Sequence, residues 1–159
     1  MYKINIGERI PDIESIDHMG VKHKFSDYIG KKLIFFFYPK ANTPGCTVQA
    51  CNLRDNYSKL KKMGYVLFGI SADNVSNQKK FSDKYNFPFI LIADSERKII
   101  EAFGVWGLKK FMGKEYEGIL RTTFIINEKG IVENIIAKVK TKDHFNQILE
   151  ASWFNYSSS

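Results

Sequence analysis

The feature that most constrains the fold is a six-residue apolar and aromatic run, residues 33–38, which ends at Pro39. An unbroken run of this length is typical of a strand that is covered on both faces. Residues 65–70 and 89–92 show the same pattern, the second directly after Pro88. The chain is therefore expected to place helices on both sides of a sheet.

Two further strands are predicted at 122–126 and 131–136, because the Asn-Glu-Lys-Gly segment at 127–130 is a strong hairpin signal. A smaller hairpin is predicted near the N-terminus, with its turn at residues 17–20. Helices are expected between the strands, at 74–85, at 95–103 and from Lys142 onward. The order of elements predicts an α/β protein with a central mixed sheet and helices on both faces.

Length and composition indicate a single domain, residues 1–155. The chain has 159 residues, of which 44% are apolar, enough to bury a core, and no linker or repeat divides it. The last predicted helix has apolar residues at helical spacing, namely Phe145, Ile148, Leu149 and Trp153. We expect the Ser-rich tail at 156–159 to fray.

The formal charge of +7 raises the question of a nucleic-acid partner. The lysines are dispersed as isolated doublets, and no basic block or nucleic-acid recognition motif is present. A nucleic-acid partner is therefore not expected. No apolar stretch approaches the roughly 20 residues that cross a bilayer. The first nine residues lack the apolar core of a secretory signal, so a cytoplasmic protein without a membrane partner is expected.

The chain has two cysteines, and the first follows a strong helix-start signal. Thr43 is a good N-cap residue, and Pro44 suits the first helical position. Cys46 then lies in the first turn, where unpaired backbone N–H groups and the helix dipole favour a thiolate. The thiolate is the reactive form of cysteine.

In a continuous helix the second cysteine, Cys51, lies about 140° around the axis from Cys46. The predicted buried stripe contains Cys46, Ala50, Leu53, Tyr57 and Leu60. The two cysteine α-carbons would be about 8–9 Å apart, whereas a disulfide requires less than about 7 Å. The cysteines can therefore pair only if this helix unwinds.

Each candidate residue also has a purely structural interpretation. A free cysteine is commonly a small buried hydrophobe, although the helix start and the second thiol favour a redox role here. Thr43 could serve only as a cap, Pro39 could end a strand, Gln49 could be an exposed polar residue, and Arg121 could pair with a surface acid. The histidines have no metal-ligand spacing, so no metal site is predicted: His18, His23 and His144.

The motif Pro39-x-x-x-Thr43-x-x-Cys46 resembles the active-site signature of peroxiredoxins. With Cys51 five residues later, the chain is most similar to the peroxiredoxin Q subgroup, also called bacterioferritin comigratory protein. The resemblance extends over roughly residues 3–150 and implies a thioredoxin-like fold. It also implies a thiol-dependent peroxidase without metal, haem or flavin. Many members of the subgroup have Glu where this chain has Gln49.

By position, the resemblance implies that Cys46 is the peroxidatic cysteine, Cys51 the resolving cysteine and Arg121 the active-site arginine. Thr43 and Pro39 complete the implied catalytic set. Cys46 would reduce hydrogen peroxide or an organic hydroperoxide and become a sulfenic acid, which Cys51 would convert to an intramolecular disulfide. Thioredoxin would be the reductant, and the protein would be a monomer.

The sequence leaves two alternative functions open. A thiol–disulfide oxidoreductase of the same fold would exchange disulfides rather than reduce peroxide, but such proteins typically carry Cys-x-x-Cys, which is absent here. A non-catalytic holdase or binding protein would leave the thiols incidental, against the catalytic signature. Peroxide consumption by Cys46→Ser and Cys51→Ser variants separates all three.

Overall fold

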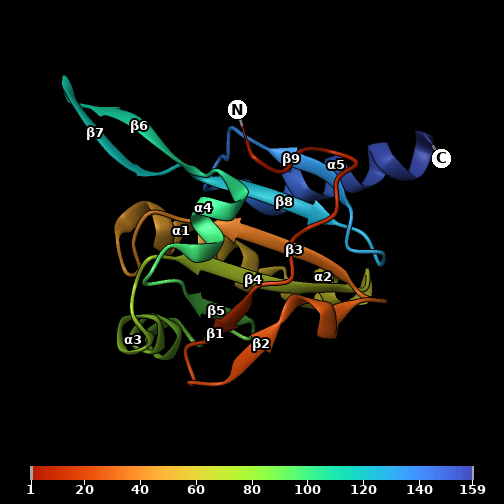
Figure 1. Cartoon of the computed structure of the whole chain (residues 1–159), viewed down its shortest axis with the longest axis horizontal. Coiled ribbons are helices and arrows are strands. Elements are labelled where there is room, and N and C mark those ends of the chain that lie inside the picture. The colour runs from red at the N-terminus through yellow and green to blue at the C-terminus, as the bar shows by residue number, and fades with distance from the viewer. Residues whose placement is uncertain (1, 159) are drawn as a thin grey trace.

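The computed structural model describes the backbone of residues 2–158 and the side chains of residues 2–152. At its centre lies a five-stranded sheet (Figure 1), in the spatial order β5 (Ile90–Ala93), β4 (Tyr65–Ser71), β3 (Lys32–Phe37), β8 (Thr122–Ile126) and β9 (Val132–Ile136). The first three strands are parallel to one another, whereas β8 is antiparallel to both β3 and β9. The predicted mixed sheet is therefore confirmed.

Helices cover both faces of the sheet, as predicted (Figure 1). On one face Phe35 and Phe37 of β3 pack with Phe103, and this cluster is covered by α4 (Lys98–Phe103) and the 3-10 helix η1 (Phe25–Tyr28). On the other face Ile34 and Phe36 share a second cluster, which is covered by α1 (Pro44–Asp55), α2 (Tyr57–Lys62), α3 (Val75–Tyr85) and α5 (His144–Ser158). The strand alternation thus supplies two separate cores.

The predicted N-terminal hairpin is present as β1 (Glu14–Ile16) and β2 (Lys22–Lys24). Asp17 Oδ1 accepts hydrogen bonds from the amides of Met19 and Val21 and so fixes the turn. The amide of His18 donates to the carbonyl of Leu91 at 2.8 Å. The hairpin extension therefore covers part of the exposed edge of β5.

The helix after Cys46 is shorter than predicted. It ends at Asp55, and α2 begins only after Asn56, whose side-chain Nδ2 donates to the carbonyl of Asn52 at 2.9 Å. Asparagine competes for backbone partners in this way and interrupts helices. The buried stripe nevertheless persists, because Leu53 and Leu60 are both fully buried.

The observed first residue agrees to within one residue with the predicted one for α3 but not for α4. Asn74 caps α3 by accepting from the amide of Asn77, close to the predicted start. By contrast, α4 begins three residues later than predicted, because Arg97 has a left-handed φ of 59° and Asp94 accepts from the amide of Ile100. The single domain at 1–155 and the frayed tail at 156–159 stay predictions, and the Trp153 side chain lies outside the described residues.

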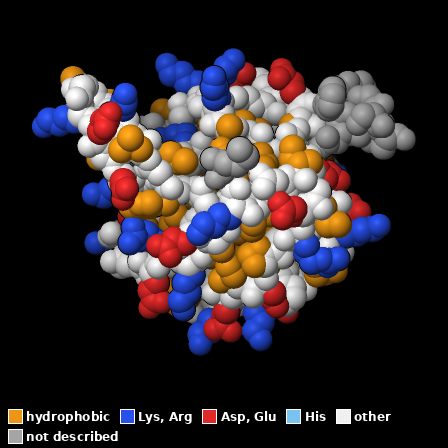
Figure 2. Space-filling view, turned by 45° about the horizontal axis from the view of Figure 1, so that its top comes forward, with side chains coloured by type: hydrophobic (Ala, Val, Ile, Leu, Met, Phe, Trp, Pro, Cys, Tyr) orange, Lys and Arg blue, Asp and Glu red, His pale blue; other side chains and the backbone are white. Residues whose placement is uncertain are grey.

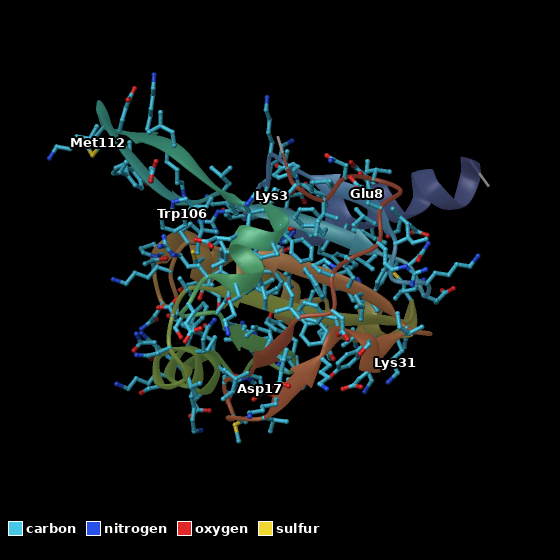
Figure 3. The ribbon with its side chains drawn as sticks, in the orientation of Figure 1. Lys3, Glu8, Asp17, Lys31, Trp106 and Met112 are labelled. Carbon is cyan, nitrogen blue, oxygen red and sulfur yellow. The ribbon has the colours of Figure 1, made fainter. Side chains whose placement is uncertain are left out.

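The sequence analysis missed the hairpin of β6 (Trp106–Phe111) and β7 (Lys114–Ile119), which projects from the body of the molecule (Figure 1). Its turn uses left-handed residues, Met112 with φ 50° and Gly113 with φ 78°, as two-residue hairpin turns require. Figure 3 places Met112 at the tip and Trp106 at the base. Hydrophobic side chains lie exposed along the hairpin (Figure 2).

Within the described residues, no helix is long and apolar enough for a bilayer crossing.

Candidate active site

Cys46 lies in the first turn of α1, where that helix begins below the end of β3. Its side chain is only 2% exposed and belongs to the cluster that contains Tyr38, Ala41 and Ala50. The first backbone bond at this end runs from the amide of Thr47 to the carbonyl of Thr43 at 2.9 Å. The amide of Cys46 therefore precedes the first intrahelical hydrogen bond and is free to donate outside the helix.

Thr43 occupies the N-cap position, but its side chain does not cap the helix. The hydroxyl donates instead to the carbonyl of Lys40 at 2.8 Å. The prediction that Thr43 caps through its side chain is therefore wrong, because the hydroxyl is turned toward Lys40 in the preceding loop and its oxygen accepts no bond from a helix amide. Its oxygen stays beside the first turn of α1, and Pro39 lies half-buried at the start of the same loop.

Arg121 reaches this turn because it directly precedes β8, and the register pairs Thr122 with Phe37 at the end of β3. The guanidinium Nη2 lies so close to Gly45 that a β-carbon there would be 3.3 Å away. The structure thus brings Arg121 to the residue next to Cys46. The structural interpretation of Arg121 was an ion pair with a surface acid. The guanidinium is positioned instead by Gln49, because its Nη1 donates to Gln49 Oε1 at 2.5 Å.

Gln49 is not the exposed polar residue that the structural interpretation allowed. Its side chain is fully buried between Arg121 and His144, with Gln49 Nε2 3.2 Å from His144 Nδ1. The other ring nitrogen of His144 lies 2.7 Å from Thr123 Oγ1. Sequence reasoning missed His144 and Thr123, since 95 residues separate His144 from Gln49.

The electrostatics of the site are dominated by positive charge. Burial, and then the nearby Arg121, lower the pKa of His144 to about 3, so the imidazole is neutral at physiological pH. Lys109 Nζ donates to the carbonyl of Ile119 at 2.9 Å. Burial, and then Arg121, lower the pKa of Lys109, while Cys46 partly opposes them. Lys109 is a third residue that the sequence analysis did not single out.

A buried polar network fixes the loop between β3 and α1 from behind. Tyr38 donates to Gln78 Oε1 at 2.5 Å, and Gln78 Nε2 donates to Ser71 Oγ at 2.9 Å. Ser71 donates in turn to Asp73, whose Oδ2 also accepts from the amide of Ala41 at 2.8 Å. Burial raises the pKa of Tyr38, so its hydroxyl keeps the proton that this network needs. The loop is therefore anchored to β4 and α3.

Cys51 lies on the same helix but does not reach Cys46. Both cysteines are free, Cys46 buried and Cys51 half-buried. Burial raises the pKa of the Cys51 thiol, although Arg54 partly offsets it. A raised pKa leaves less thiolate, so Cys51 is less reactive than an ordinary cysteine while the helix is intact. No group of three or more His, Cys, Asp or Glu suited to a metal ion occurs among the described residues.

Comparison with known proteins places this arrangement in a family. The AhpC/TSA family matches residues 6–135. The chain belongs to the AhpC/TSA family. Peroxiredoxin Bcp of Bacillus subtilis (strain 168) is 45% identical over 147 residues, 92% of this chain and 94% of the relative. Peroxiredoxin Bcp of Escherichia coli (strain K12) is 41% identical over 149 residues, 94% of this chain and 96% of the relative.

A solved structure agrees with this membership. Bacterioferritin comigratory protein of Xanthomonas campestris, studied for its alkyl peroxide reduction activity, has a TM-score of 0.84 and 30% identity. The match covers 92% of this chain and 96% of that chain. The predicted peroxiredoxin membership, the thioredoxin-like fold and the thiol-dependent peroxidase function are confirmed.

Proposed function

We propose that Cys46 is the peroxidatic residue of this thiol peroxidase and that Arg121 binds the peroxide. The supporting observation is the position of the Arg121 guanidinium beside Gly45, next to the buried thiol. The Cys46 thiolate attacks one peroxide oxygen, so an S–O bond forms while the O–O bond breaks. The departing oxygen takes a proton and leaves as water or an alcohol, and Cys46 becomes a sulfenic acid.

Negative charge moves onto the departing oxygen in this step, so fixed donors aimed at it lower the barrier. Arg121 offers several N–H donors in one plane and remains charged at any working pH. The free amide of Cys46 and, after rotation, the hydroxyl of Thr43 add donors to the same place. Pro39, half-buried ahead of the turn, shields the sulfur from bulk water.

Cys51 resolves the sulfenic acid in the second step. Its thiol attacks the Cys46 sulfur, a disulfide forms and water leaves. The intact helix keeps the two α-carbons about 8–9 Å apart, so the first turns of α1 unwind for the reaction. Unwinding also removes Cys51 from the burial that raises its pKa, which makes a thiolate more accessible at that moment.

The proposed partners follow from this cycle. A dithiol protein of the thioredoxin type reopens the disulfide by exchange. Hydrogen peroxide and organic hydroperoxides are the proposed substrates, in keeping with the alkyl peroxide reduction studied in the Xanthomonas campestris relative. Because the cycle needs reduced thiols, we place the protein in the cytoplasm. An intramolecular disulfide needs no second copy, so we propose a monomer without nucleic-acid or membrane partners.

Serine substitution of each cysteine tests the two assigned roles. Cys46→Ser is expected to abolish peroxide consumption with thioredoxin and thioredoxin reductase, because the thiol beside Arg121 is gone. Cys51→Ser should still consume one equivalent of peroxide and then stop or recycle slowly. Mass spectrometry of the unsubstituted protein after one equivalent of peroxide should locate a 46–51 bridge. Full turnover by Cys46→Ser would refute the assignment.

Replacement of the arginine tests the peroxide-binding role. Arg121→Ala should lower the second-order rate constant with hydrogen peroxide about 10²-fold, the usual scale for removal of an oxyanion-type donor. Arg54→Ala is the matched control, because Arg54 bonds Asp55 and the carbonyl of Tyr85 away from the thiol. An unchanged rate in Arg121→Ala would rule out the assigned role.

A further inference from the structure

Four polar side chains, three of them fully buried, form a hydrogen-bonded chain behind the thiol. Arg121 Nη1 lies 2.5 Å from Gln49 Oε1, Gln49 Nε2 3.2 Å from His144 Nδ1, and His144 Nε2 2.7 Å from Thr123 Oγ1. Gln49, Thr123 and His144 each have no exposed surface. The chain joins α1, β8 and the start of α5, so it exists only in the folded protein.

The direction of this chain is fixed from the arginine end. A guanidinium only donates, so the Gln49 atom that faces Arg121 must be the amide oxygen. The amide nitrogen then faces His144, and because it only donates, His144 Nδ1 must carry no proton. A neutral imidazole without a proton on Nδ1 carries it on Nε2, which donates to the Thr123 oxygen. Each bond thus determines the next.

We propose that His144 is a positioning residue for peroxide reduction: its unprotonated Nδ1 orients the Gln49 carboxamide, whose oxygen holds the Arg121 guanidinium beside Cys46. This inference rests on the peroxide-binding role proposed for Arg121. Without an acceptor at His144, the Gln49 amide could rotate and present its NH2 group to the guanidinium. Two donors would then face each other, and Arg121 would move from its place beside Gly45.

The surroundings keep His144 in the required neutral form. From α1 it faces the uncharged Gln49, from β8 the uncharged Thr123, and from β3 the ring of Phe36 at 6.1 Å between centroids. The charged group that acts on it is Arg121, which with burial disfavours the imidazolium. A proton on Nδ1 would oppose the amide N–H of Gln49, so geometry and charge agree.

The start of α5 is attached to α1 by a second, independent contact. Asn52 Oδ1 accepts from the amide of Phe145 at 2.8 Å, and Asn52 Nδ2 donates to the carbonyl of Lys142 at 3.2 Å. Ile148 packs in the same cluster as Leu53. The docking of α5 therefore does not depend on the imidazole alone, which makes a substitution at position 144 interpretable.

The tautomer of His144 in the unsubstituted reduced protein gives the first test. Nitrogen-15 NMR at pH 7, with the ring assigned through its contact with Phe36, should detect a proton on Nε2 and none on Nδ1. A proton on Nδ1, in either the neutral or the charged ring, would overturn the proposal. This measurement needs no variant, so it decides the question whether or not a substituted chain folds.

A double-mutant cycle gives the second test, with single-turnover reduction of hydrogen peroxide by the reduced protein as readout. His144→Phe should lower the rate constant about tenfold, less than loss of Arg121 itself. In an Arg121→Ala background the same change should have less than about a twofold effect, because coupled residues are not additive. His18→Phe, at the β5 edge, is the matched control and should leave the rate unchanged.

The outcomes separate this inference from the proposed function. Equal losses from His144→Phe in both backgrounds would mean a general structural effect and would overturn the positioning role. An unchanged rate in His144→Phe would overturn it as well. Failure of the proposed function would appear differently, as peroxide turnover that survives in Cys46→Ser or as an unchanged rate in Arg121→Ala.

Discussion

At the scale of single residues, the pKa of His144 differs strongly between the unfolded and the folded chain. Its ordinary pKa is 6.5, whereas burial and then Arg121 lower the pKa to about 3 in the folded protein. Between these two pH values the His144 imidazole is protonated in the unfolded chain and neutral in the folded chain. The free energy of unfolding therefore falls as the pH falls through this window.

Acidification should expose this effect in stability measurements. From pH 6.5 toward 3, His144 lowers the free energy of unfolding by up to about 1.4 kcal/mol per pH unit. Urea unfolding at several values between pH 7 and 5 should show a smaller loss in His144→Phe than in the unsubstituted protein. Parallel pH dependences in the two proteins would contradict a neutral buried imidazole.

At the scale of elements, α1 carries both cysteines, and Cys46 lies in its first turn. Thr43 supplies no side-chain cap, and the two cysteines lie on different sides of the helix. Gln49 lies between the cysteines in sequence and is bonded to both Arg121 and His144. On the proposed mechanism, unwinding to form the disulfide would also separate Gln49 from Arg121, so the resolving step would disrupt the proposed peroxide site.

Hydrogen exchange measures this unwinding directly. Amides of residues 47–53 should be protected in the reduced protein and should exchange faster after one equivalent of peroxide, because the helix must open to join the cysteines. Amides of β3 are the internal control and should stay protected in both states. Equal, strong protection of residues 47–53 in both states would exclude the unwinding step.

At the scale of the whole molecule, the sheet separates two hydrophobic cores, and only one of them contains Cys46. Phe68 is fully buried in the core on the α4 face, whereas Cys46 belongs to the core on the α1 face. The aromatic rings of Phe35, Phe25 and Tyr28 contact Phe68 edge-on at centroid distances of 5.1–6.4 Å. Stability on this face should therefore be separable from the chemistry on the other.

Substitution of two phenylalanines tests this separation. Phe68→Ala should lower the free energy of unfolding by about 3–5 kcal/mol, the usual cost of a phenylalanine-sized cavity. Phe111→Ala is the control, because that side chain is 66% exposed and should change stability little. Well below the unfolding temperature, both variants should keep the rate constant with hydrogen peroxide. A lowered rate in folded Phe68→Ala would contradict the separation.

The sequence by itself determined the strands of the central sheet, the helices on both faces and the position of Cys46 at a helix start. These features depend on neighbours in the chain: the unbroken apolar runs, the hairpin signal at 127–130, and Pro44 after Thr43. The break at Asn56 was missed because a side chain took a backbone acceptor. The β6–β7 hairpin was missed because its strands pair only with each other within the described residues and stay largely exposed.

Only the tertiary structure decided which polar groups meet at the thiol. The pairing of Phe37 with Thr122 brings Arg121 to the start of α1, and the docking of α5 brings His144 to Gln49. Local sequence encodes conformation and burial, because these depend on propensity and on the periodicity of apolar residues. The identity of a buried hydrogen-bond partner depends instead on how distant elements pack, and that is decided by the whole core at once.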